Sequence, residues 1–525
     1  MRAPYSRTLF DLLCEQAERH PEALAVVCSG REVSFAALQA GARRVAGGLQ
    51  ASGVRRGDNV ALLLDNRLEW LELCFGAAAL GAVLVPFSTW SRRRELEFLF
   101  AEREYKLLFT ADALAEHDFL ADLEGLPLPP RVVVLGERAG PWEAWRDFID
   151  PSAPLAVIPP PGEGATAESP ALVLHTSGST AYPKAVPLLH GAMIENGFNI
   201  GERQGLVPGD RVLLPAPLFW SYGSANALMA AFTHGAALVL QRRFEAGEAL
   251  DLIERHRCTS IYTLPAMTNA LVLHPAFSPN RTGTLCKGMT IGSPRDVETA
   301  ATVLGATGLC NIYGQTESYG NCCVTWHHWP LARRMQTQGP PLPGVQLRLA
   351  DEQTGAPVAA GEPGLLEVRG YVMPGYIGTS AAHNAEAFTA DGWFRTGDLC
   401  ELTPDGHLRF LGRTTEMIKR NGINISPAEV EDVLRVCPGV AEVGVVGVDD
   451  DARGQAVLAF VVAKPGVELD VAAVREFCRT EAASYKTPDR IERCAALPLT
   501  PTGKLQRSEL KKMAAALKTP APRSV

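Results

Sequence analysis

Buried-strand runs alternate with helical stretches in the first part of the chain. The apolar run at residues 60–64 (VALLL) is followed by a helical pattern over 70–79 and by a second apolar run at 82–87 (AVLVPF). Neighbouring parallel strands need a crossover connection, which is usually a helix. The alternation therefore predicts an α/β fold with a largely parallel sheet, and a second such set follows over residues 211–310.

The chain is too long for a single core. Its 525 residues suggest about three domains. After residue 338 the pattern changes to short strands separated by Gly and Pro turns, which predicts a β-rich subdomain. The last hundred or so residues mix short helices and strands, as a compact α+β domain does, and the tail at 519–525 is expected to be disordered.

The overall composition excludes several classes of protein. The net charge is -8, from 50 basic and 58 acidic residues, which gives no field for binding nucleic acid. The twelve cysteines form no C-x-x-C pair, so neither a disulfide framework nor a structural metal site is expected. Adjacent histidines in WHHW, residues 326–329, point different ways and lack a third ligand. No apolar run is long enough to span a membrane, and we expect a cytoplasmic protein.

The stretch TSGSTAYPK, residues 176–184, follows the apolar run ALVLH and so leaves the end of a predicted strand. Loops rich in glycine and hydroxyl residues present N–H and O–H groups to phosphate oxygens, and Lys184 adds a positive charge. The same composition also forms ordinary turns. These residues alone therefore leave a phosphate loop and a plain turn as alternatives.

Further segments downstream of this loop occur in a characteristic order. With the loop, they resemble the motifs of the adenylate-forming superfamily, which contains acyl-CoA ligases, luciferases and the adenylation domains of peptide synthetases. The resemblance covers nearly the whole chain, and this many motifs in the family's order are highly specific. The segments are TSGSTAYPK at 176, PLFWSYG at 217, YGQTES at 313, GWFRTGDL at 392, GRTTEMIKRNGINISPAEVE at 412 and PTGKL at 501.

The resemblance implies an enzyme in two parts. The larger is an amino-terminal domain over residues 1–413, built of two αβ layers plus the β-rich subdomain at about 338–413. The smaller is a mobile α+β domain over residues 417–518. The segment 414–416 is then a hinge, marked by Thr415, about which the small domain turns between an adenylating and a thioester-forming pose.

The resemblance also implies a site for ATP and AMP. In the family, the loop holds the triphosphate, while an aspartate and an arginine contact the ribose. These residues correspond to Asp398 and Arg413, and a carboxylate can accept both ribose O–H groups. The alternative for Asp398 is a turn residue. The nucleotide-binding residues implied are Thr176, Ser177, Gly178, Ser179, Thr180, Lys184, Gly292, Tyr313, Gly314, Asp398 and Arg413.

The catalytic residues implied by the resemblance are Thr316, Glu317 and Lys504. Thr316 corresponds to a residue near the phosphates, and Glu317 to a ligand of Mg²⁺. A carboxylate beside phosphate is repelled unless a cation lies between them, although a solvated glutamate in a turn is the alternative. Lys504 would contact the acid's carboxylate and the α-phosphate and spread negative charge, although a surface lysine is the alternative.

The remaining implied residues concern coenzyme A and the acid. Asn421 and Gly422 fall where the family lines its pantetheine tunnel, and glycine allows the thiol arm a close approach. The family often has a histidine where Trp220 stands. An indole there can floor an apolar acyl pocket or be an ordinary core aromatic. The implied acyl-pocket residues are Trp220, Gly223, Gly292 and Gly314.

The chain departs from the family's pattern at two regions. Ala181 and Ala185 stand where the phosphate loop usually has glycine. A methyl group at Ala181 is expected to cost about 1 kcal/mol of strain or to displace the triphosphate, and the change at Ala185 is milder. Thr415 replaces a common Lys or Asp, and Leu499 replaces a common basic residue. Each departure affects adenylation or domain rotation.

The function implied is that of an acyl-CoA ligase. It would activate a hydrophobic carboxylic acid as an acyl-AMP, with ATP and Mg²⁺, and transfer the acyl group to coenzyme A. Ala181 leaves open a variant that only converts acyl-AMP to acyl-CoA, supplied by a separate adenylating partner enzyme. A carrier-loading adenylation enzyme and a non-catalytic binding protein are further alternatives. The acid's identity and the oligomeric state, including a homodimer, stay open.

Overall fold

The chain folds, in a computed structural model, into two compact units. The first contains Met1–Leu347 and Val368–Arg395, and the second contains Arg348–Glu367 and Thr396–Val525. The structure describes residues 3–114, 117–149, 158, 164–176, 183–379, 381–414, 416–420, 423–450, 454–482, 486–500 and 505–517. What the sequence predicts for the other residues stays a prediction.

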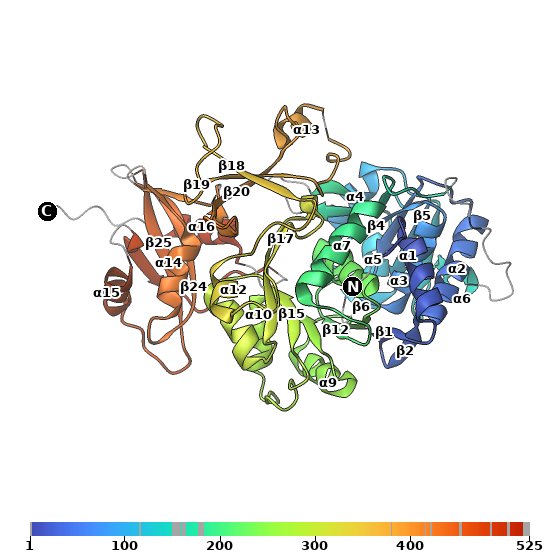
Figure 1. The fold of residues 1–525 in the computed structure, drawn as a ribbon, viewed down its shortest axis with the longest axis horizontal. Coiled ribbons are helices and arrows are strands. Elements are labelled where there is room, and N and C mark those ends of the chain that lie inside the picture. Colours follow the sequence, from blue (N-terminus) through green and yellow to red (C-terminus); the bar gives the residue numbers. More distant parts are fainter. Residues whose placement is uncertain are drawn as a thin grey trace. The chain divides into compact units, whose positions relative to one another are not determined.

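The amino-terminal helices of the first unit pack against one another. They are α1 (Leu9–Arg19), α2 (Phe35–Ala51) and α3 (Leu68–Ala79), and α2 also contacts the first strands of the chain (Figure 1). The side chain of Thr8 accepts a hydrogen bond from the Asp11 N–H at 3.3 Å, so Thr8 is the N-cap of α1. The helix predicted over residues 70–79 is confirmed by α3.

An eight-stranded sheet contains the second predicted βα set. In sheet order its strands are β17 (Cys323–Val324), β16 (Gly308–Tyr313), β15 (Lys287–Thr290), β14 (Ser260–Tyr262), β12 (Arg211–Leu214), β13 (Ala237–Leu240), β1 (Leu24–Cys28) and β2 (Arg31–Ser34). The strands from β16 to β1 run parallel, and the edge strands β17 and β2 run antiparallel to their neighbours. This confirms the predicted parallel sheet.

A seven-stranded sheet carries the ends of the candidate phosphate loop. In sheet order its strands are β11 (Lys184–Leu189), β10 (Pro170–Thr176), β4 (Val83–Pro86), β3 (Asn59–Leu63), β5 (Leu107–Ala111), β8 (Arg131–Leu135) and β9 (Glu143–Ala144). Only β10 and β11 pair in antiparallel fashion. The loop therefore connects two neighbouring antiparallel strands, and β11 was not predicted from the sequence.

Helices connect the strands of the first unit. The apolar face of α9, with Leu250 and Ile253, shares one core cluster with Leu213 of β12 and Ile261 of β14. No helix in the described part of the chain is long and apolar enough to cross a membrane.

The further elements of the first unit are α4 (Arg93–Glu102), β6 (Ala113–Leu114), β7 (His117–Asp118), α5 (Phe119–Leu123), α6 (Trp145–Phe148), α7 (His190–Gln204), η1 (Tyr222–Leu228), α8 (Met229–Thr233), α9 (Ala246–His256), α10 (Pro265–Val272), α11 (Pro294–Glu298), η2 (Thr299–Val303), η3 (Thr316–Ser318), α12 (Leu331–Gln336) and α13 (Ala381–Ala387).

The segment predicted to be β-rich contains a four-stranded sheet. In sheet order its strands are β18 (Gln346–Ala350), β19 (Pro363–Arg369), β20 (Phe394–Leu402) and β21 (Leu408–Arg413). Strands β20 and β21 are antiparallel, and Asp398 is the register partner of Arg413. This register places two predicted nucleotide-binding residues opposite each other.

The carboxy-terminal part of the second unit is a sheet with an apolar cluster on each face. Its elements are β22 (Ile418–Arg420), β23 (Ile423–Ile425), α14 (Pro427–Arg435), β24 (Val440–Asp450), β25 (Gly454–Ala463), α15 (Val471–Glu481), β26 (Arg490–Arg493) and α16 (Arg507–Ala516). Val445 packs with Leu434 of α14, whereas the next residue, Val446, packs with Leu510 of α16. Successive strand residues point to opposite faces, so helices lie on both sides of the sheet. The predicted α+β domain is confirmed.

A buried histidine makes the stability of the fold depend on pH. His190 is fully buried at the start of α7, and its Nδ1 accepts a hydrogen bond from the Leu9 N–H at 3.2 Å. Burial lowers the pKa of His190 from 6.5 to about 4. As the pH falls through this window, the unfolded chain binds the proton first, so the free energy of unfolding decreases.

We expect this histidine to remove up to about 3 kcal/mol of stability between pH 6.5 and pH 4. Denaturant titrations across this range would show the loss. His190→Gln should flatten the dependence, whereas His328→Gln, at an exposed position, should keep it. An unchanged pH dependence in His190→Gln would contradict the assignment.

Candidate functional site

The two ends of the candidate phosphate loop lie side by side. Thr176 is the last residue of β10, Lys184 is the first of β11, and the two are register partners. The main chain of Lys184 therefore lies beside that of Thr176, where the loop begins and ends. The loop residues predicted to contact phosphate, together with the substituted alanine, lie outside the described residues: Ser177, Gly178, Ser179, Thr180 and Ala181.

Tyr376 links Lys184 to Glu317. Its hydroxyl donates a hydrogen bond to Oε1 of Glu317 at 2.9 Å, and Nζ of Lys184 lies 4.8 Å from the centre of its ring. The N–H of Met373 also donates to the carbonyl of Glu317 at 2.8 Å. A cation and a carboxylate from separate motifs thus meet at one side chain, which the sequence analysis did not identify.

Ala185 fits its place in the strand. It is buried, and its carbonyl accepts a hydrogen bond from the Ile377 N–H at 3.0 Å. Ala185 is not among the described residues that have positive φ. A methyl group there adds no backbone strain, so this alanine is compatible with the fold.

Glu317 and Thr316 form the short helix η3, which follows closely after Tyr313 at the buried end of β16. The side-chain oxygens of Thr316 and Ser221 lie 3.1 Å apart. Glu317 is almost buried, with 8% of its surface exposed. Within the described ranges no protein donor contacts its second oxygen, Oε2.

The donor set around Glu317 fits a magnesium ion that also binds phosphate. Mg²⁺ is commonly held by one or two carboxylates together with oxygens of the substrate's phosphates. Among the residues that the structure describes, no group of three or more potential metal ligands occurs. Glu317 could therefore serve as a single protein ligand to a phosphate-bound ion.

Two glycines of the predicted acyl pocket are required by close packing. A Cβ on Gly314 would overlap the carbonyl oxygen of Gly320 and the backbone of Asn321. Gly292 has a φ of +137°, and a Cβ there would lie 2.7 Å from Oδ2 of Asp296. Both positions therefore need glycine for the fold itself, whichever ligand binds nearby.

Trp220 belongs to a cluster of aromatic rings. Its ring centre lies 5.0 Å from that of Trp90, which also contacts Phe219 edge-on at 5.2 Å. Gly223 follows on η1, where a Cβ would overlap the carbonyl oxygen of Pro217. The indole thus has a partner from a distant segment, Trp90, that sequence reasoning missed.

Asp398 and Arg413 form an ion pair across two strands. Nε of Arg413 lies 3.2 Å from Oδ1 of Asp398, and the carboxylate is buried while the arginine side chain is half exposed. The N–H of Asp398 donates to Oγ1 of Thr396 at 3.1 Å. The two predicted ribose contacts are therefore neighbours.

The hinge, coenzyme A and lysine positions lie outside the described residues: Thr415, Asn421, Gly422 and Lys504. Arg507, which is close in sequence to Lys504, contacts Glu416, which directly follows Thr415. Its Nε lies 3.0 Å from Oε2 of Glu416, and its Nη1 donates to the carbonyl of Val445 at 2.8 Å. A bidentate pair with the buried Glu431 completes the contacts of this side chain.

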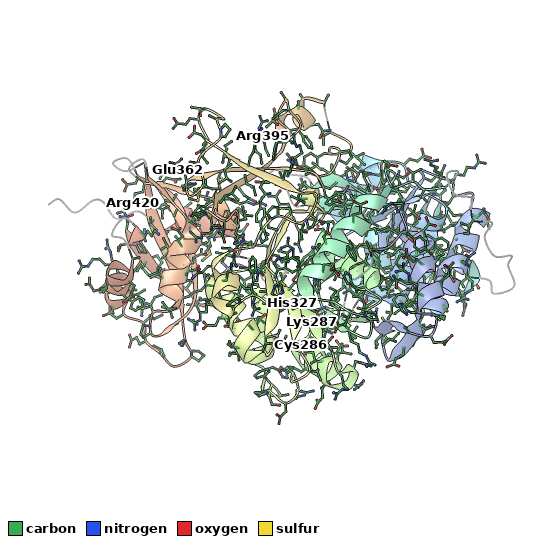
Figure 2. All side chains as sticks on the ribbon, viewed as in Figure 1. Cys286, Lys287, His327, Glu362, Arg395 and Arg420 are labelled. Carbon is green, nitrogen blue, oxygen red and sulfur yellow. The ribbon has the colours of Figure 1, made fainter. Side chains whose placement is uncertain are left out.

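The WHHW segment has structural contacts. Nδ1 of His327 lies 3.0 Å from the carbonyl oxygen of Arg203, whose guanidinium lies 4.3 Å from the ring centre of Trp326. Burial, with a smaller effect of the Lys287 charge, lowers the pKa of His327; both residues are labelled in Figure 2. These contacts attach the segment to α7.

Comparison with known proteins identifies both parts of the chain. Residues 13–377 match the family described as AMP-binding enzyme, and residues 429–504 match the AMP-binding enzyme C-terminal domain. The second match begins within α14 and ends at Lys504.

Individual relatives match over nearly their full length. The chain is 32% identical over 507 residues to the sulfoacetate–CoA ligase of Cupriavidus necator, covering 96% of this chain and 97% of that protein. It is 32% identical over 531 residues to ScoC of Streptomyces coeruleorubidus, a fatty acid–[acyl-carrier-protein] ligase, covering 97% and 96%. The solved anthranilate CoA ligase AuaEII, in complex with anthranoyl-AMP, superimposes with a TM-score of 0.88 at 27% identity, covering 98% of this chain and 100% of that one.

Proposed function

Since this chain belongs to the AMP-binding enzyme family and is an AMP-forming acid–thiol ligase, we propose that it converts a hydrophobic carboxylic acid to its coenzyme A thioester. The acid would first react with ATP to form an acyl-AMP and pyrophosphate. The thiol of coenzyme A would then displace AMP. The first step consumes ATP, whereas the second needs the acyl-adenylate and coenzyme A but no ATP.

The observation that carries this proposal is the meeting of Lys184 and Glu317 at Tyr376. In our proposal Lys184 faces the phosphates of ATP and Glu317 faces the Mg²⁺ that accompanies them. When bound, Mg²⁺ supplies positive charge that neutralises the phosphate oxygens. Tyr376 holds the carboxylate in place, so that its second oxygen is directed to the ion.

The other predicted residues take the following roles in this proposal. The buried carboxylate of Asp398 accepts the ribose hydroxyls, and Arg413 contacts the ribose or a phosphate. Lys504 contacts the reacting carboxylate, while Asn421 and Gly422 line the path of the coenzyme A thiol. Trp220, Gly223, Gly292 and Gly314 border the acid.

The thiol acceptor and the cellular context are part of the proposal. Coenzyme A is favoured because two of the matched proteins are named CoA ligases, whereas ScoC is named a ligase of an acyl-carrier protein. None of the twelve cysteines, all of which lie in the described part of the chain, forms a disulfide, which is compatible with a reducing compartment such as the cytoplasm. A homodimer and a separate adenylating partner enzyme are compatible with the proposal.

A mass-spectrometric screen tests the proposed reaction. Mixtures of fatty, aromatic, alicyclic and terpenoid acids are incubated with the protein, ATP, Mg²⁺ and coenzyme A. We expect one acid class to yield its acyl-CoA together with AMP. Formation of AMP without any acyl-CoA, followed by acylation of a carrier protein, would show that the carrier-loading alternative is correct.

A second candidate function follows from Ala181, which replaces a loop glycine. If its methyl group hinders closure on the β- and γ-phosphates, the enzyme would form acyl-CoA only from an acyl-AMP supplied by another enzyme. Acyl-CoA formation from synthetic acyl-AMP, measured apart from pyrophosphate release, separates the two functions. Fast pyrophosphate release by the wild type would exclude this candidate.

Under this second function, Ala181→Gly should accelerate pyrophosphate release roughly fivefold, because about 1 kcal/mol of strain is removed. Ala185→Gly is the matched control, since Ala185 has no positive φ to relieve. Acyl-CoA formation from acyl-AMP should be unchanged in both variants. Equal acceleration by the two substitutions would rule out a specific effect of Ala181.

The role of Tyr376 leads to a prediction for metal dependence. Tyr376→Phe removes the hydrogen bond to Glu317 and should raise the Mg²⁺ concentration required for half-maximal adenylation about tenfold, since a hydrogen bond to a charged group contributes about 1.5 kcal/mol or more. Tyr371→Phe is the control, because the Tyr371 hydroxyl donates to Glu195 instead. An unchanged Mg²⁺ requirement in Tyr376→Phe would refute the positioning role.

A further inference from the structure

Three asparagines form a buried polar cluster in the first unit. They are Asn196 on α7, Asn226 on η1 and Asn321 shortly after η3, each with at most 1% of its surface exposed. Nδ2 of Asn196 donates to the carbonyl of Asn321 at 3.0 Å. A Cβ on Gly320 would overlap Nδ2 of Asn226 and lie 3.2 Å from its Oδ1. Asn196 and Asn226 thus approach the backbone at residues 320–321 from two different helices, while Nδ2 of Asn321 lies 3.9 Å from Sδ of Met289.

Four amide atoms of this asparagine cluster have no hydrogen-bond partner within the described part of the chain. They are Oδ1 of Asn196, Oδ1 of Asn321, and both Oδ1 and Nδ2 of Asn226. Folded proteins pair nearly all buried polar groups, because an unpaired one keeps the full cost of leaving water. Because both Oδ1 and Nδ2 of Asn226 lack a partner, exchanging the two atoms by rotating the amide would still leave an unpaired acceptor and an unpaired donor group. A group other than a protein side chain is the natural partner.

The asparagine cluster borders the residues assigned to the acid. Asn226 lies on the same short π-helix as Gly223. Gly314 packs against the backbone of Gly320 and Asn321, which a Cβ on Gly314 would overlap. Single π-helical turns occur frequently at functional sites. With Gly223 and Gly314 assigned to the acyl pocket in the proposed function, the unpaired amide atoms lie next to that pocket.

We propose that the asparagine cluster binds a hydroxyl group on the acyl chain of the substrate. This inference rests on the proposed acyl-CoA ligase function. A hydroxyl donates one hydrogen bond and accepts others, which matches the unpaired donor and acceptor of Asn226. An acid that is apolar along its whole length would leave these atoms unpaired, so the site rejects it. The substrate is a largely apolar acid with an O–H on its acyl chain.

Binding of acyl-adenylate analogues tests this preference without requiring turnover. The probes are sulfamoyl adenosines carrying octanoyl, its terminal hydroxyl derivative, cinnamoyl, or para-hydroxycinnamoyl groups. Calorimetry on the full chain should show that, in at least one pair, the hydroxylated member binds at least about tenfold more tightly. In Asn226→Leu the affinities within that pair should become nearly equal. Asn226→Ala serves as a second variant if leucine is too large.

Thermal melting separates a recognition role from a structural role. Asn226→Leu should melt at or above the wild-type temperature, because it removes amide atoms that have no partner. The control is Asn311→Leu. Asn311 is also buried, but its amide donates to the carbonyls of Arg334 and Thr337 and accepts from the Ile312 N–H. Asn311→Leu should therefore melt at a lower temperature.

Several results would overturn the hydroxyl preference. Equal affinities within both pairs in the wild type, or a retained preference in both Asn226→Leu and Asn226→Ala, would refute it and leave the ligase function standing. A fall in melting temperature of Asn226→Leu as large as that of Asn311→Leu would assign the amide a structural role instead. Failure of all four analogues to bind would overturn the proposed function and this inference together.

Discussion

Replacement of Lys504 by alanine is expected to slow acyl-adenylate formation by at least about a hundredfold. Removing one preorganised positive group from a developing negative charge typically has an effect of this size. In the proposed reaction the ammonium group acts while pyrophosphate leaves. Acyl transfer from supplied acyl-AMP to coenzyme A should therefore be spared. Pyrophosphate release and acyl-CoA formation, measured separately, give the two rates.

Lys511 provides the matched control for this prediction. It lies on α16, close in sequence to Lys504, and its side chain is exposed. Lys511→Ala makes the same change of charge and should leave both half-reactions at wild-type rates. If Lys504→Ala slowed both half-reactions equally, the lysine would not have a role confined to adenylation.

Arg507→Leu should destabilise the second unit by about 3 to 5 kcal/mol. The substitution removes the bidentate partner of the buried Glu431 carboxylate, which keeps only the Val445 N–H at 2.8 Å and a longer contact with Arg435 at 3.8 Å. Breaking a buried ion pair from one side has a cost of this size. It also removes the contact with Glu416. Denaturant unfolding of the full chain, followed by a probe in the second unit, measures the loss.

Two further variants show whether the loss comes from the ion pair. Arg479→Leu removes an exposed pair with Glu476 and should change stability by less than about 1 kcal/mol. The double variant Arg507→Leu with Glu431→Leu should recover much of the stability, because the buried carboxylate that lost its bidentate partner is also removed. An effect of Arg507→Leu as small as that of Arg479→Leu would contradict the importance of this pair.

The fold followed from local sequence patterns where strands are buried on both faces. The apolar runs at residues 60–64 and 82–87 became β3 and β4, since such strands need no alternation of polar side chains. The short strands β11, β22, β23 and β26 were not predicted. Strands β22, β23 and β26 have only three or four residues, several of them polar, so they lack the apolar run seen in β3 and β4. They form because a neighbouring strand supplies hydrogen bonds, as β10 does for β11.

The candidate site was predicted in part from the sequence. Motif order indicated Glu317, Asp398 and Arg413, and the register of β20 and β21 then showed that the last two pair with each other. No signal near Tyr376 indicated that its hydroxyl contacts Glu317. The roles of Lys504, Thr415, Asn421 and Gly422 stay predictions, because these residues lie outside the described ranges.

By itself, the sequence determined the class of fold and the kind of reaction. Strand and helix patterns are local, and the motifs contain the charged and hydroxyl groups that nucleotide chemistry requires. Only the tertiary structure decided that Lys184 and Glu317 share Tyr376 and that Asn196 and Asn226 approach the backbone beside Asn321. Contacts between distant segments depend on strand order, register and helix packing. Hydrogen-bond pairing of a buried group can be judged only after those contacts are known.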